Sequence, residues 1–404
     1  MDTPFTVALV LLVLLLGVGF AFDGGDAASG GKPRPPAAGA EPTAPVTTIA
    51  RRVEQIRGLR FKRPPVPAEV SPAQAQRDGL EDLDRSYPAA QRHADEEVLK
   101  LVGLLQPKID LRHVSATVFG QGVAGYYDPR TKRLRIVRGA QTTNRFLEEI
   151  TLAHELTHAL EDQRFGLGLA DTSGSDDAAL ARLALVEGSA TAVMFTYAER
   201  HFTSDQTLGG LFAGLGQDTG DLPPFVEAQL LFPYLAGQRF VQELYRTGSN
   251  GWSLLNTADH FRPPASTEQV LHPQKYLAVE QPDRVRLDAR RVLGKGWRRL
   301  AAGTWGEWAT GELLGDPGAA EGWGGDRYEL WQQPGGACPA PCRQHDALVM
   351  RWRWDTRRDA REFDTILREW LAKQPGPSAT VARGRNVTLA LAPEAGLARR
   401  LARG

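Results

Sequence analysis

Two histidines four residues apart, His154 and His158, flank a glutamate, Glu155. Residues at this spacing lie one turn apart on the same face of a helix. Their imidazoles can therefore bind one zinc ion, and Glu155 can act as general base on a zinc-bound water. The pattern predicts a metal-binding helix over residues 143–163.

A zinc site that hydrolyses bonds needs three protein ligands and one open position. A third histidine six residues after His158 is excluded, because Arg164 stands there. Glu187 is the candidate third ligand, since it lies in the nearly all-apolar stretch 178–195. A carboxylate buried in such a helix needs a cation, a proton or a metal, because its unpaired charge is costly. Pairing of Glu187 with a distant arginine remains the alternative.

The surrounding patterns predict the elements that position these residues. Glu187 would lie on a second helix over about 175–202, and a third helix is predicted over 224–245. Two strand-like runs within 123–137 predict a hairpin around a proline turn just before the metal helix. Such a hairpin can offer an edge strand to an extended peptide, or it can be plain sheet structure. Helices are also predicted over 49–59 and 72–105, the latter broken at Pro88.

The patterning changes character near residue 285. Three strands and one helix are expected beyond it, over residues 328–331, 347–354, 387–391 and 359–371. The predicted fold class is α+β. It comprises a mainly helical, zincin-like catalytic domain at 49–284, with a small β-sheet or hairpin before the zinc helix, and a small C-terminal α+β domain at 285–404.

The two cysteines of the chain, Cys338 and Cys342, lie in a loop rich in glycine and proline. A small disulfide fits this spacing if the region faces an oxidising compartment. Free thiols remain an alternative, and His345 nearby leaves a metal interpretation open.

Residues 3–22 carry no charge and are mostly apolar, which is typical of a targeting or membrane-anchoring segment. We predict a transmembrane anchor or signal peptide at 1–22, followed by a disordered linker rich in Pro, Gly and Ala at 23–48. The predicted localisation is the cell membrane, with a single-pass anchor and the catalytic domain outside the cytoplasm. Cleavage of the segment would make the protein secreted.

The charges of the chain balance, with 48 Lys and Arg against 48 Asp and Glu. No net field would attract nucleic acid, so no nucleic-acid partner is expected. The expected partners are a protein or peptide substrate and, through the N-terminal segment, the membrane.

The set His154, Glu155, His158 and Glu187 resembles the gluzincin, or thermolysin-like, zinc metallopeptidases. Further motifs are similar to a bacterial family of membrane-anchored proteins in the same zincin class. These motifs are the metal helix itself, Gly125-Tyr-Tyr-Asp-Pro, Leu185-Val-Glu-Gly-Ser-Ala-Thr and Ser266-Thr-Glu-Gln-Val-Leu-His-Pro. Together they span about residues 56–276.

The resemblance implies one catalytic zinc ion and a histidine that stabilises the oxyanion, for which His272 is the candidate. Weaker candidates for that role are Tyr126, Tyr127 and Arg262. Thermolysin-like enzymes also carry an aspartate four residues after the ligand glutamate, but Thr191 stands there in this chain. Asp162 is a possible substitute that would orient a zinc ligand.

The predicted function is that of a zinc-dependent endopeptidase in which Glu155 accepts a proton from water and passes it to the leaving amine. Two alternatives stay open. One is a zinc hydrolase of non-peptide amides or esters, and the other is a zinc-binding scaffold or inactive protease homologue.

Overall fold

The computed structural model describes residues 44–120, 125–137, 145–167, 175–206, 222–249, 251–335 and 338–404. The predicted anchor at 1–22 lies outside the described residues, as does the predicted linker up to residue 43. The first described helix begins at Val46, three residues before the predicted start of the folded region. The protein is α+β, as the sequence predicted.

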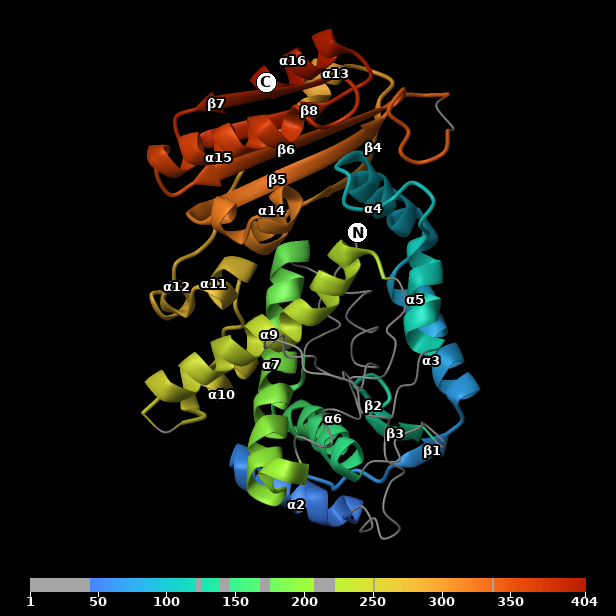
Figure 1. Ribbon diagram of the computed structural model, residues 1–404, viewed down its shortest axis with the longest axis vertical. Helices are drawn as coiled ribbons and strands as arrows, with labels where there is room; N and C mark the ends of the chain where they lie inside the picture. The colour runs from blue at the N-terminus through green and yellow to red at the C-terminus, as the bar shows by residue number, and fades with distance from the viewer. Residues whose placement is uncertain are drawn as a thin grey trace, which may run out of the picture.

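The part of the described chain before residue 285 is mainly helical (Figure 1). Its elements are α2 (Val46–Arg57), β1 (Ala68–Val70), α3 (Pro72–Ser86), α4 (Ala89–Leu101), α5 (Leu111–Gly120), β2 (Gly125–Asp128), β3 (Arg133–Val137), α6 (Arg145–Phe165), α7 (Asp176–His201), α9 (Pro224–Thr247), α10 (Ser253–His260), α11 (Thr267–Leu271) and α12 (Pro273–Leu277). Serines cap two of the predicted helices, because the Ser71 and Ser175 side chains accept backbone N–H groups at the starts of α3 and α7.

A small sheet precedes the metal helix, with strand order β1-β3-β2. The predicted hairpin is confirmed as the antiparallel pair β2 and β3, and β1 adds a parallel strand that the sequence did not predict. Successive side chains of a strand face opposite sides. Tyr127 and Leu134 therefore pack with α6, while Tyr126 and Val137 pack with α3 and α5.

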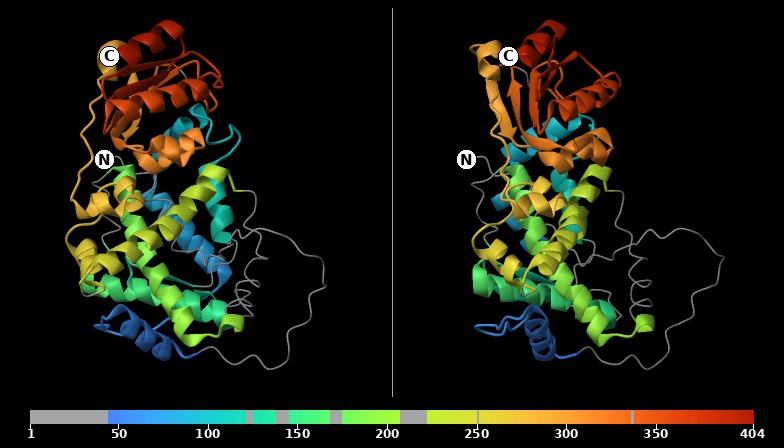
Figure 2. Two further views of the ribbon diagram at one scale, coloured as in Figure 1. Left: turned by 60° about the vertical axis from the view of Figure 1, so that its left-hand side comes forward. Right: turned by 90° about the vertical axis from the view of Figure 1, so that its left-hand side faces the viewer.

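The long helix α7 runs through the middle of the protein, between α6 and α9 (Figures 1 and 2). Among the described residues it is the one helix long and apolar enough to cross a membrane, and 67% of its most apolar window is buried inside the protein. Neighbouring helices cover the apolar surface of α7, which explains a stretch with almost no polar stripe.

The region after residue 285 forms a five-stranded antiparallel sheet with order β4-β5-β6-β8-β7. Its elements are α13 (Ala289–Leu293), β4 (Arg298–Gly303), α14 (Gly306–Leu314), the 3-10 helix η1 (Pro317–Ala320), β5 (Trp323–Gln332), β6 (Asp346–Trp354), α15 (Arg357–Leu371), β7 (Ser378–Arg383), β8 (Asn386–Leu391) and α16 (Ala395–Arg403). The three predicted strands and the predicted helix are present here, while β4, β7, α14 and α16 were not predicted. This sheet lies at the opposite end of the protein from α6 and the first sheet (Figure 1).

Both faces of the second sheet are covered. One face packs against α14, α15 and α4, and the other against α13 and α16. The helix α4 reaches this sheet from the N-terminal half of the chain, through residues such as Val98 and Leu101. A packing core therefore extends across the domain boundary predicted at 284/285.

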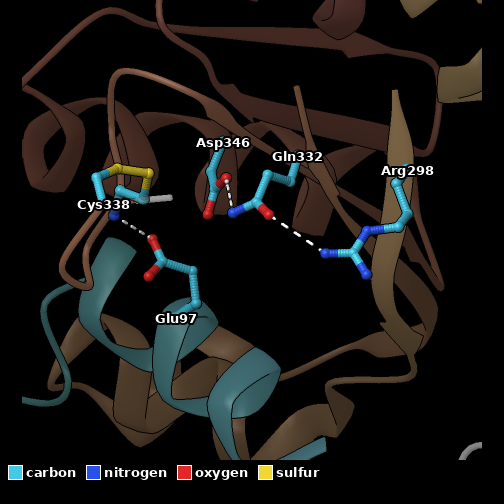
Figure 3. The surroundings of a disulfide bond; sticks show 6 residues. Glu97, Arg298, Gln332, Cys338 and Asp346 are labelled. Atoms are coloured by element: carbon cyan, nitrogen blue, oxygen red, sulfur yellow. Dashed lines mark hydrogen bonds between the residues drawn. A yellow bond between two sulfur atoms is a disulfide. The ribbon is translucent and has the colours of Figure 1, made fainter. Parts of the chain in front are cut away.

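A disulfide between Cys338 and Cys342 lies where α4 meets the second sheet (Figure 3). The backbone N–H of Cys342 donates to Glu97 of α4 at 2.6 Å. Burial and the nearby carboxyl of Asp346 raise the pKa of Glu97 to about 7, against the opposing effect of the Cys342 hydrogen bond. The nearby carboxyl of Asp346 therefore favours the protonated form of Glu97.

Candidate metal centre

Three ligand-type atoms meet where α6 crosses α7. The Nε2 atoms of His154 and His158 lie 3.0 Å apart, and Glu187 Oε2 lies 3.1 Å from the first and 3.4 Å from the second. His158 and Glu187 are fully buried, and His154 is 7% exposed. The structure therefore brings together all three residues that the sequence predicted as metal ligands.

The separations within this triad, His154–His158–Glu187, fit a tetrahedral metal ion. Two atoms that each lie about 2.0–2.1 Å from a tetrahedral zinc ion are about 3.3–3.4 Å apart. The three observed separations are close to this edge length, so small side-chain adjustments would suffice. Two imidazoles and one carboxylate also form a donor set that zinc prefers at hydrolytic sites.

The electrostatics of the triad favour a bound cation. Although burial alone would raise the pKa of Glu187, the two histidines hold it at about 2, so the carboxylate is ionised. Burial lowers the pKa of His154 and opposes protonation of His158, but Glu187 and Glu155 raise the pKa of His158 to about 9. The ionised Glu187 thus attracts positive charge, either as a proton on His158 or as a metal ion that displaces that proton.

Glu155 is oriented by the edge strand next to α6. Its Oε2 accepts the backbone N–H of Tyr127 on β2 at 2.7 Å. Burial raises the pKa of Glu155 to about 8, against the opposing effects of His158 and of the Tyr127 hydrogen bond. A divalent cation at the triad would favour the ionised form of Glu155. The carboxyl group is therefore held in one orientation at a pKa suited to proton exchange near neutral pH.

A close approach of two glycines brings α9 to the triad. A Cβ atom at Gly188 would lie 2.2 Å from the backbone of Gly237, and one at Gly237 would lie 2.0 Å from the Ala184 carbonyl oxygen. Any larger side chain at either position would push α7 and α9 apart. Gly188 directly follows Glu187, so this contact sets the distance from the ligand to α9.

Tyr234, one helical turn before Gly237 on α9, is the site residue that the sequence analysis missed. Its ring stacks on His154 with centroids 5.9 Å apart, and its hydroxyl lies close enough to Glu187 to feel the charge of that carboxylate. Burial and the charge of Glu187 raise the pKa of Tyr234 well above its usual value, so it stays neutral. The sequence signal for this contact is a pair of glycines, one in each of the two apolar helices, where the helix backbones can approach closely.

The structure does not bring His272 to the triad, which corrects the role predicted for it. His272 lies at the junction of α11 and α12, and its Nε2 is 2.8 Å from Glu307 Oε1 on α14. The hydrogen bond to Glu307 raises the pKa of His272. Together with Lys275, His272 lines an open cavity of about 730 Å³ beside the second sheet. The predicted loop forms two short helices that dock on α14, and this docking carries His272 away from α6.

The weaker candidates also have other partners. The Tyr126 hydroxyl donates to Asp78, and the Arg262 guanidinium lies over the ring of Tyr276. Asp162, the predicted substitute for the missing aspartate, accepts from the Tyr127 hydroxyl at 2.7 Å and from Lys132 rather than from a ligand histidine. That prediction is wrong, because the side chain of Asp162 is turned toward the hairpin.

A buried ion pair supports α6 behind the triad. The Nε of Arg57 donates to Glu161 Oε1 at 2.5 Å, and the Ser189 hydroxyl donates to the same oxygen at 2.5 Å. Arg57 comes from α2 and Ser189 from α7, so one carboxylate on α6 connects three helices. Ser189 is two residues after Glu187, which fixes α7 against α6 at the ligand.

Comparison with known protein families gives a match over the C-terminal region. Residues 290–402 are similar to a family described as "Domain of unknown function (DUF8575)". No curated protein and no solved structure matches the chain. The matched residues contain the whole second sheet, β4 to β8, and lie outside the metal triad.

Proposed function

We propose that this protein is a zinc-dependent endopeptidase of the gluzincin type. The observation that carries the proposal is the buried triad of His154, His158 and Glu187, with ligand atoms 3.0–3.4 Å apart and the oriented carboxyl of Glu155 beside it. A purely structural zinc site is closed by four protein ligands and does not need such a carboxyl group. Three ligands and one acid instead favour hydrolysis.

The residues at the metal centre would each carry out a part of the hydrolysis. A zinc ion held by the triad would supply Lewis acidity, which polarises a carbonyl and acidifies water. Glu155 accepts the proton of the attacking water and passes it to the leaving amine nitrogen, so that the amide bond breaks into an acid and an amine. The Tyr127 N–H holds one oxygen of Glu155 at 2.7 Å during both transfers. The proton taken from water is thus the one delivered to the product.

Tyr234 is proposed in the role that the sequence assigned to His272. Among the described residues it supplies a neutral hydroxyl directly beside Glu187 and His154. A neutral donor in a buried site can stabilise negative charge that develops on a substrate carbonyl oxygen.

We also propose that residues 1–22 anchor the protein in the cell membrane, with the metal centre outside the cytoplasm. The uncharged apolar stretch 3–22 supports the anchor. The disulfide between Cys338 and Cys342 supports an oxidising compartment.

The test is a metal analysis joined to a peptide-library digest of the purified protein and of a Glu155→Gln variant. We expect about one zinc per chain in both proteins. Cleavage by the wild type should be lost on chelation, and Glu155→Gln should lower kcat by about 10²–10⁴-fold. Glu199→Gln, which changes an exposed acid on α7, serves as the matched control and should cleave like the wild type.

Undiminished cleavage by Glu155→Gln would refute the proposed mechanism. Zinc bound stoichiometrically without cleavage of any peptide would favour the scaffold, or a hydrolase of other amides, over an endopeptidase.

A further inference from the structure

The first turn of α7 lies against the C-terminal part of the protein and is partly buried there. Asp176 and Asp177 occupy this turn, where acidic residues suit the positive end of the helix dipole. Such residues are normally exposed, but Asp177 is 3% exposed here. The Tyr328 hydroxyl on β5 donates to Asp176 Oδ2 at 3.2 Å. The start of the helix that carries Glu187 is therefore in contact with the C-terminal region, defined here as residues 289–404.

One threonine hydroxyl links three helices at this contact. Thr267 begins α11, and its backbone N–H and Oγ1 donate to Asp177 Oδ1 at 3.1 and 2.5 Å. The same Oγ1 accepts the backbone N–H of Trp308 on α14 at 3.2 Å. A hydroxyl has one donor and two acceptor sites, so Thr267 can satisfy both neighbours at once.

Two glycines let the C-terminal backbone reach the aspartates. A Cβ atom at Gly306 would lie 1.9 Å from Asp177 Oδ1, and one at Gly303 would lie 2.5 Å from Asp176 Oδ2. Gly306 also has a φ of +88°, which favours glycine. The connection between β4 and α14 therefore fits against α7 at backbone distance.

The same region also packs against α9. The Trp308 ring lies 5.2 Å from the Phe232 ring and 5.5 Å from the Phe225 ring, measured between centroids. Both phenylalanines belong to α9, the helix that carries Tyr234 and Gly237. The C-terminal region thus contacts α7 and α9, two of the three helices that place side chains at the metal centre.

We propose that the C-terminal region positions the ligand Glu187 by clamping α7 and α9, and that Thr267 is the positioning residue of this clamp. The proposal rests on the metal site described above. Asp177 lies ten residues before Glu187 on one continuous helix, about 15 Å at 1.5 Å per residue. A packed helix moves as a unit, so displacement at its first turn displaces the ligand. This assigns a role to the region that matches a domain of unknown function.

The first test compares Thr267→Val with Thr267→Ser in the full chain. Valine keeps the shape of the threonine side chain but lacks the hydroxyl, whereas serine keeps the hydroxyl. Zinc affinity is measured by competition with a chelator, and the melting temperature of the zinc-free protein is recorded alongside. We expect Thr267→Val to bind zinc about five-fold more weakly or worse, and Thr267→Ser to restore affinity toward wild type.

The outcomes separate the clamp from the proposed function. Zinc affinity that is unchanged in Thr267→Val overturns the clamp and leaves the metal site intact. A wild type that binds no zinc overturns the metal site and, with it, the basis of the clamp. Affinity lost equally in Thr267→Val and Thr267→Ser also overturns the clamp, because the hydroxyl is then not the coupling group.

The second test uses a matched pair of glycines in the C-terminal region. Gly306 and Gly315 both have positive φ values, +88° and +67°, so alanine strains the backbone at either position. A Cβ at Gly315 meets nothing within 4 Å, whereas one at Gly306 meets Asp177. Gly306→Ala should weaken zinc binding and Gly315→Ala should not. Equal weakening by both would show a general loss of stability and overturn the clamp, and if Gly306→Ala fails to fold, the Thr267 pair decides.

Discussion

Among the described residues, two groups of metal-ligand side chains lie close enough together to share a cation, and they differ in what balances their charge. In the first, Glu268, Glu280 and Asp355 surround the Nζ atom of Lys275 at 2.6, 3.0 and 2.6 Å. In the second, the triad, the ion-pair partners of Glu187 in the described part of the chain are His154 and His158, and neither is a lysine or arginine.

The difference shows why only one of the two is a candidate metal centre. An ammonium group already occupies the centre of the carboxylate cluster, and it supplies the positive charge that these acids need. The triad offers imidazoles, which bind a metal through their lone pairs once the metal has displaced the proton of His158. Three converging acidic or histidine side chains are therefore not enough to identify a metal site. What matters is whether the protein supplies its own cation.

The largest expected effect is the loss of zinc affinity when the Glu187 carboxylate of the triad is neutralised. The same change in the lysine-centred cluster is the comparison. Glu187→Gln removes the buried charge of the triad and should weaken zinc binding by about 10³-fold, which corresponds to about 4 kcal/mol. Glu268→Gln is the matched change in the lysine-centred cluster and should leave zinc affinity within about two-fold of wild type. Chelator competition measures both. Equal loss in the two variants would contradict the comparison.

An intermediate effect is expected when the internal cation is removed. Lys275→Met keeps most of the side-chain volume and leaves the buried Glu268 facing two other acids. The free energy of unfolding should fall by about 2–3 kcal/mol, less than for a fully buried pair because Lys275 is partly exposed. Millimolar Ca²⁺ should then raise the melting temperature of this variant more than that of wild type. An identical Ca²⁺ response would show that Lys275 does not take the place of a cation.

The smallest expected effect concerns Glu97 and Asp346, a carboxyl pair that uses a proton instead of a cation. The pKa of Glu97 in the folded protein, about 7, lies above its usual value of 4.5. As pH rises through this window the unfolded chain releases a proton that the folded protein retains, so the free energy of unfolding falls. Glu97→Gln removes this dependence and can keep the hydrogen bond from the Cys342 N–H.

Urea unfolding at pH 5 and pH 8 tests this prediction. Relative to wild type, Glu97→Gln should gain about 1–2 kcal/mol of stability between pH 5 and pH 8. A difference between variant and wild type that does not change with pH would mean that no proton is shared in this pair.

Local patterns predicted much of the fold around the site. The nearly all-apolar run 178–195 placed α7 over nearly its observed length, and Ser175 marked its start. The proline turn after Asp128 marked the hairpin. Such signals depend on residues within one or two turns of each other in the chain. At this range, local hydrogen bonds and the spacing of apolar side chains are enough to determine the secondary structure. Strand β1 was missed for two reasons. It has only three residues, too few to show an alternating pattern, and its partner β3 lies over 60 residues away in the chain.

The site was predicted as far as its chemistry depended on spacing or on the energetic cost of burial. The pair His154 and His158 follows from helix geometry, and Glu187 follows from the cost of an unpaired carboxylate in an apolar helix. His272 was misplaced, because its position depends on how α11 and α12 dock on α14. No local pattern describes that docking.

The sequence by itself determined the composition of the metal site, because residue identity and helical period decide which side chains share a face. Only the tertiary structure decided which other residues join it. Tyr234 reaches Glu187 because Gly188 and Gly237 let two helices meet at backbone distance. Thr267 reaches α7 because the C-terminal part of the protein packs against the first turn of that helix. Contacts of this kind join residues far apart in the chain, and their free energy depends on the shapes of whole elements.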